Sequence, residues 1–166
     1  MSTTILVASL LTIIGAATPL LLAALGELVV ERSGVLNLGV EGMMLAGAVT
    51  GFAATMVTGS GTVGVVAAAL AGMAMALLFG VLTLSLLSNQ VATGLALTIF
   101  GVGLSALVGS GFAGSPVAPL PKLALPGLSQ LPIVGPVLFG QDFLVYLSWA
   151  MTAAVAWFLT PTRPGM

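Results

Sequence analysis

The charged side chains that could do chemistry lie mostly in one stretch, residues 27–44. Four of the seven charged residues in the chain are here: Glu27, Glu31, Arg32 and Glu41. Apolar sequence flanks the stretch on both sides, and a charge near the middle of a bilayer costs about 2.5–3.5 kcal/mol on insertion scales. We therefore expect the stretch either to mark a boundary between water and membrane or to line a polar cavity between helices.

The rest of the chain has few of the residue types that enzymes use for catalysis. There is no cysteine and no histidine, so a thiol metal site and the usual proton shuttle are both missing. The single lysine, Lys122, lies in a proline-rich segment, and no Walker A pattern surrounds it. No basic patch suggests a nucleic-acid partner. The sequence predicts neither an enzyme nor a bound cofactor or metal.

The composition indicates a membrane protein. Hydrophobic residues make up 59% of the 166 residues and charged residues only 4%, and residues 42–121 carry no charge. A soluble domain has about 25% charged residues, and about 20 apolar residues suffice to cross a bilayer. We predict an all-α fold, a polytopic transmembrane helical bundle. The expected membrane segments are about five: residues 4–25, 39–57, 63–87, 91–108 and 143–159.

A broken helix is expected near residues 33–38. Gly34, Gly39 and Gly42 interrupt the apolar pattern, and glycine is poor in helix interiors. Asn37 is a candidate N-cap for the helix that follows, because its side chain can accept from a free backbone N–H group. The segment is either re-entrant, lining a cavity at membrane depth, or an ordinary cytoplasmic loop. The residues leave both interpretations open.

Small residues recur on one face of each of the next three spans. They are Gly47, Gly51 and Thr55; then Gly64, Ala68, Gly72, Ala76 and Gly80; then Gly94, Thr98, Gly101 and Ser105. Such stripes let helices pack closely in lipid. The last stripe is also polar, so Thr98 and Ser105 either face a solute pathway or lie in a seam between helices.

Residues 109–142, rich in proline, are expected to form a folded loop on the membrane surface, with residues 131–139 dipping into the interface.

Several runs resemble the membrane permease subunits of bacterial ABC importers, in the branch for simple sugars, nucleosides and branched-chain amino acids. They are TPLLLAALGE (18–27), ERSGVLNLGVEGMM (31–44), NQVATGLALTIFGVGL (89–104) and TRPG (162–165). The resemblance implies a multi-pass subunit of the bacterial cytoplasmic (inner) membrane that translocates a nucleoside or simple sugar. Its implied partners are a second permease subunit in a homo- or heterodimer, cytoplasmic ABC ATPase subunits that hydrolyse the ATP, and an extracytoplasmic solute-binding protein.

The family motif carries over to six positions, which we expect to shape the broken helix beside the pathway: Glu27, Gly34, Asn37, Gly39, Glu41 and Gly42. Thr98 and Ser105 complete the candidate site. Members of the family are longer, and their ATPase-coupling segment follows a stretch like residues 162–165. Residues 1–166 are therefore expected to be the N-terminal part of a single permease domain. A stand-alone channel or secondary carrier, and an inactive truncated fragment, remain alternatives.

Overall fold

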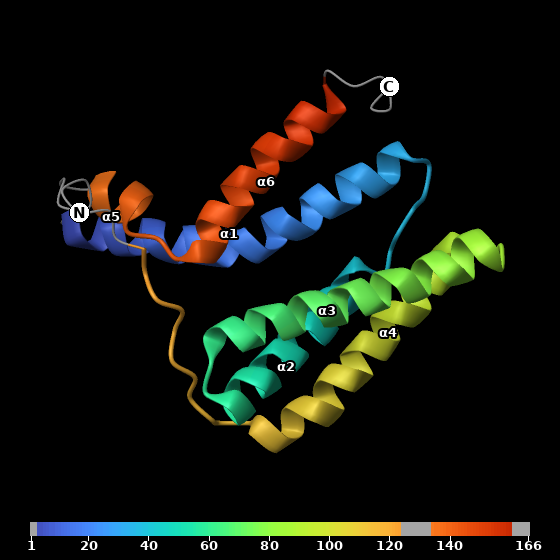
Figure 1. The fold of residues 1–166 in the computed structure, drawn as a ribbon, viewed down its shortest axis with the longest axis horizontal. Coiled ribbons are helices and arrows are strands. Elements are labelled where there is room, and N and C mark those ends of the chain that lie inside the picture. The colour runs from blue at the N-terminus through green and yellow to red at the C-terminus, as the bar shows by residue number, and fades with distance from the viewer. Residues whose placement is uncertain (1–2, 124–133, 161–166) are drawn as a thin grey trace. The chain divides into compact units, whose positions relative to one another are not determined.

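The computed structural model describes residues 3–123 and 134–160, and these are helical apart from connections and one isolated β-bridge. The elements are α1 (Thr3–Arg32), α2 (Val40–Thr58), α3 (Gly61–Gly80), a π-helical turn η1 (Val81–Ser85), α4 (Gln90–Gly109), a 3-10 turn η2 (Ser110–Phe112), α5 (Val134–Phe139) and α6 (Phe143–Leu159) (Figure 1). Among the residues that the structure describes, four helical stretches are long and apolar enough to cross a membrane, and α6 is shorter, at 17 residues. The predicted all-α class with about five apolar segments is confirmed.

The described residues divide into two compact units. One contains those of Met1–Arg32 and Leu120–Met166, and the other is Ser33–Pro119. In the second unit α2 packs against both α3 and α4. Its buried core consists of Ala46, Met75, Phe79 and Leu97. This unit contains the predicted break and all the small-residue stripes.

The break falls where it was predicted, because α1 ends at Arg32 and α2 begins at Val40. The first helix, however, extends seven residues past the expected end at Leu25. Nothing between Gly26 and Gly34 interrupts helix formation, so Glu27, Glu31 and Arg32 lie on the last turns of α1. A helix of 30 residues is about 45 Å long, whereas the hydrocarbon core is about 30 Å thick. The extra length lets charged residues near one end reach beyond the apolar layer.

The seam between α2 and α3 uses the two predicted stripes in part. A Cβ atom added at Gly51 would lie 2.9 Å from the Gly64 carbonyl oxygen, and one added at Gly47 would lie 3.2 Å from that of Ala68. Gly72 and Gly80, by contrast, face open space within this chain. Positions four apart drift by about 40° around a helix at each step. The later half of the α3 stripe therefore turns away from α2, and Met75 and Phe79 take over the buried face.

The third span also ends differently from the prediction of one helix over residues 63–87. After Gly80 the α-helix becomes the π-helical turn η1, in which the Leu86 N–H donates to the Val81 carbonyl at 3.0 Å. Leu87 has a left-handed backbone, with φ of 53°. The Ser88 hydroxyl donates to the Leu82 carbonyl at 2.7 Å, which closes the turn.

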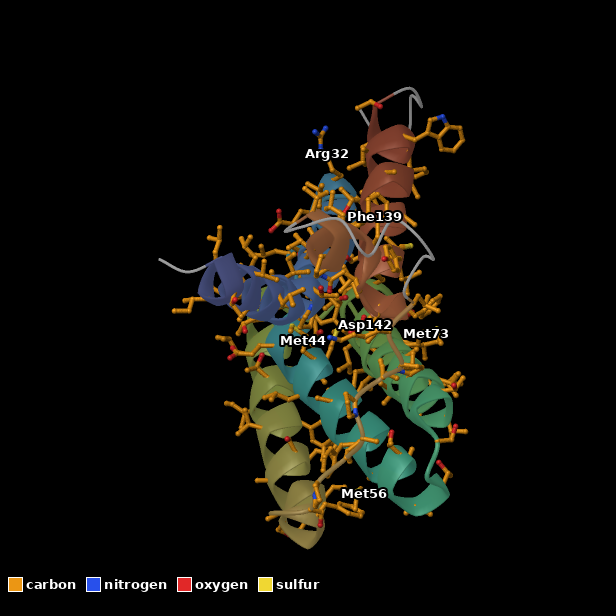
Figure 2. The ribbon with its side chains drawn as sticks, turned by 90° about the vertical axis from the view of Figure 1, so that its left-hand side faces the viewer. Arg32, Met44, Met56, Met73, Phe139 and Asp142 are labelled. Atoms are coloured by element: carbon orange, nitrogen blue, oxygen red, sulfur yellow. The ribbon has the colours of Figure 1, made fainter. Side chains whose placement is uncertain are left out.

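In the first unit α1 contacts α5 and α6. Two of its residues, Thr18 and Leu25, are buried. The end of the proline-rich region is folded, since Lys122 and Asp142 form an antiparallel bridge and the Leu123 N–H donates to the Gln141 carbonyl at 2.9 Å. Residues 134–139 form the short helix α5, while 131–133 and the TRPG run at 162–165 lie outside the described residues. Figure 2 places Asp142 at the connection before α6.

Candidate functional site

The segment between α1 and α2 is held first by its own asparagine. Asn37 is buried, with 7% of its surface exposed, and its Oδ1 atom accepts from the Gly39 N–H at 2.9 Å. The N-cap of α2 is Gly39, and it has no side-chain cap bond. The prediction that Asn37 is the N-cap is therefore wrong by two positions. The physical task is nevertheless the expected one, because the side chain satisfies a backbone N–H at the helix start.

Two side chains of α4 reach the same segment from far along the chain. The Leu36 N–H donates to Oε1 of Gln90 at 2.8 Å, and the Thr98 hydroxyl donates to the Leu38 carbonyl at 2.9 Å. Both bonds satisfy backbone groups that lie outside any helix. Such groups are costly in an apolar environment when they have no partner.

Glycines let the backbone of α4 contact the backbone of the segment before α2 and of the first turn of α2. A Cβ added at Gly94 would lie 2.8 Å from the Leu38 nitrogen, and one added at Gly42 would lie 2.6 Å from the Thr98 Cα. One added at Gly101 would lie 2.5 Å from the Gly42 Cα. Real Cβ atoms do not approach so closely, so a side chain at Gly42 or Gly101 must push α2 and α4 apart, and one at Gly94 must push α4 away from Leu38 and Gly39. The small-residue stripe of α4 therefore forms a seam with α2 and the segment before it, at Gly94, Thr98 and Gly101.

The structure brings together four of the eight predicted site residues: Asn37, Gly39, Gly42 and Thr98. Gly34 precedes them, exposed, with a φ of 83° that favours glycine. Ser105 is partly buried, further along α4.

The two predicted acidic site residues differ in burial and in the unit to which they belong. Glu41 is exposed in the first turn of α2, where a negative charge interacts favourably with the helix dipole. Glu27 is partly buried on α1 and belongs to the other unit. Figure 2 shows Arg32 at the end of the same helix. Glu41 thus directly precedes Gly42 at the start of α2, whereas Glu27 belongs to α1.

Gln90 is a residue of the site that the sequence did not single out. Its neighbour Asn89 caps α4, accepting from the Ala92 N–H at 3.0 Å. The available signal was its spacing: Gln90 lies four residues before Gly94 and eight before Thr98. These three positions fall within an arc of about 80° on a helix.

Within residues 3–123 and 134–160, no group of three or more histidine, cysteine or acidic residues could hold a metal ion. The polar side chains at the site are an amide, a second amide and a hydroxyl, and the bonds described above tie all three to backbone groups. This arrangement can hold a stretch of non-helical backbone between apolar helices.

Comparisons with known proteins match nearly the whole chain. The model of the family described as "Branched-chain amino acid transport system / permease component" matches residues 9–166. A protein of Haloferax volcanii, described as "Putative glucose ABC transporter permease protein TsgC13", is 45% identical over 155 residues. That alignment covers 91% of this chain and 47% of the relative, so the chain spans about half the length of this curated relative. No solved structure matches the chain.

Proposed function

Because the chain belongs to the family of permease components of branched-chain amino acid transport systems, we propose that it forms the membrane pathway of an ABC importer for a small polar solute. The match over residues 9–166 is the observation that carries this proposal. A simple sugar is the proposed solute class, since the relative from Haloferax volcanii is described as a glucose transporter permease.

The broken segment supports a role in the pathway. It contacts α4 at Gly94 and Thr98, which lie four and eight residues past the first residue of that helix, or about 6 and 12 Å along its axis. In the proposed function this contact lies below the membrane surface. Lipid cannot satisfy non-helical backbone at that depth, and such backbone is tolerated only where it is buried in protein or lines a water-filled cavity. Transporters use discontinuous helices of this kind around their solute sites.

The eight candidate residues divide by role in this proposal. Asn37, Gly39, Gly42 and Thr98 shape the break and its contact with α4, and Gly34 ends the turn after α1. Ser105 extends the polar stripe further along α4. Glu41 and Glu27 contribute charge at either end of the broken segment. None of these roles requires contact with nucleotide.

The proposed partners follow from the family. ATP hydrolysis belongs to separate ABC ATPase subunits, and the solute arrives from an extracytoplasmic solute-binding protein. A second permease subunit, identical or different, completes the pathway in the cytoplasmic membrane.

Solute uptake by cells tests the proposal. Cells that express the whole transporter should take up labelled sugar, and deletion of this chain should abolish that uptake. Uptake of labelled nucleoside in place of sugar would keep the transport role and change the solute class. Uptake that is unchanged by the deletion would refute the proposal.

Solute flux through liposomes that contain this protein without any ATPase would instead favour a stand-alone channel or carrier. An inactive fragment would neither support uptake nor co-purify with an ATPase.

A further inference from the structure

Side chains bond to three backbone groups of the segment before α2: the N–H groups of Leu36 and Gly39 and the carbonyl of Leu38. Each has one side-chain partner. The partner of Gly39 is local, because Asn37 is only two residues away. The other two partners, Gln90 and Thr98, come from α4, 54 and 60 residues further along the chain. The shape of the segment therefore depends on α4 as well as on its own sequence.

Gln90 and Thr98 take opposite roles in their hydrogen bonds to the segment. Gln90 must accept, since the Leu36 N–H is the donor, whereas Thr98 must donate, since the Leu38 carbonyl can only accept. Gly94 lies between them on α4, and its lack of a side chain lets the backbone of Leu38 and Gly39 approach. The two bonds thus hold the segment at Leu36 and at Leu38, and the α4 backbone at Gly94 contacts it directly.

We propose that Gln90 and Thr98 are positioning residues that clamp residues 36–38 in their non-helical form against α4. The clamp keeps the start of α2 at Val40 and prevents residues 36–39 from adding a turn to that helix. The hydroxyl proton of Thr98 is used by the clamp, so in this state it is not offered to a passing solute. The consequence for transport rests on the proposed function, whereas the clamp itself does not.

Hydrogen exchange of the protein in lipid nanodiscs tests the clamp without any transport assay. Thr98→Val keeps the shape of the side chain and removes the donor, and Gln90→Leu removes the acceptor. Two further variants keep the hydrogen-bonding group: Thr98→Ser retains a hydroxyl donor, and Gln90→Glu retains an oxygen acceptor. Thr58→Val is the matched control, because Thr58 lies at the other end of α2, where its hydroxyl donates to the Ala54 carbonyl at 2.7 Å and accepts from the Ser60 N–H at 3.3 Å.

The expected result is exchange about fivefold faster over residues 36–42 in Thr98→Val and in Gln90→Leu, the equivalent of about 1 kcal/mol for one hydrogen bond. Thr98→Ser, Gln90→Glu and Thr58→Val should stay within about twofold of the unsubstituted protein. Unchanged exchange in both loss variants would overturn the clamp. Equal acceleration in Thr98→Ser and Gln90→Glu would overturn it too, since the hydrogen bond of the side chain would then not matter.

Sugar uptake by the same variants separates the clamp from the proposed function. A positioning role predicts a lower maximal rate with KM within about twofold. A KM that rises about tenfold or more in Thr98→Val, without faster exchange, would make Thr98 a solute contact and overturn the clamp. Faster exchange with unchanged uptake would leave the clamp in place and remove the broken segment from the proposed pathway.

Discussion

Replacing Gly101 by alanine tests the contact between α2 and α4 most sharply. The added Cβ would lie 2.5 Å from the Gly42 Cα and 2.7 Å from its carbonyl carbon. Carbon atoms pack best at about 3.5–4.0 Å, so the two helices must separate by about 1 Å. The three atoms nearest to the new methyl group all belong to the Gly42 backbone, which cannot rotate away as a side chain would.

The expected loss of stability can be worked from two contributions. Overpacking of a tight contact costs about 1–3 kcal/mol. A separation of about 1 Å would also stretch the bond between Thr98 and the Leu38 carbonyl from 2.9 Å to about 3.9 Å, beyond hydrogen-bonding distance, at a further cost of about 1 kcal/mol. The higher helix propensity of alanine offsets about 1 kcal/mol of this loss, so the free energy of unfolding of Gly101→Ala should fall by about 1–3 kcal/mol.

Denaturant titration of the purified protein in mixed micelles measures this change. Gly103→Ala is the matched control, because it lies on the same helix, is exposed and has no atom within 4 Å of an added Cβ. Alanine favours a helix over glycine by about 1 kcal/mol, so this control should be neutral or more stable. Equal stability of the two variants would refute the account of the α2–α4 contact.

Two further substitutions address the start of α2. Asn37→Ala should lower the free energy of unfolding by about 1–2 kcal/mol, because the Gly39 N–H loses its partner in a buried position; chemical denaturation measures this, and no change would mean that water replaces the amide. Glu41→Ala should reduce sugar uptake by the whole transporter more than Glu31→Ala does, although both residues are exposed. Equal uptake by those two variants would remove Glu41 from the candidate site.

Local signals predicted the helices well. The last span, residues 143–159, coincides with α6, whose start is fixed by Asp142 accepting from the Val145 N–H. The predicted ends of the second and fourth spans lie one residue from those of α2 and α4, since glycine, serine and asparagine mark the boundaries. The first span was predicted too short because its charged residues were taken as the start of a polar stretch. A helix longer than the bilayer can carry charges on its last turns.

The parts of the site that sequence missed depend on distant residues. The bond from Leu36 to Gln90 joins positions 54 apart, and no local pattern specifies it. The polar stripe on α4 was compatible with a pathway or a seam, and only the glycine contacts with α2 and the segment before it showed that Gly94 and Gly101 form a seam. The π-helical turn after Gly80 likewise had no signal in a continuous apolar run.

The central claim is that the segment before α2 lines a path for a polar solute, and cysteine labelling tests it directly. The chain has no native cysteine, so Leu38→Cys introduces a single thiol at an exposed position, and Ile99→Cys provides one at an exposed apolar position of α4. In the whole transporter in lipid vesicles, a charged, membrane-impermeant thiol reagent should modify the cysteine at position 38 and spare that at position 99. The transported sugar should slow modification at position 38. Modification at position 38 at the same rate with and without sugar, as in a loop open to water, would contradict the account.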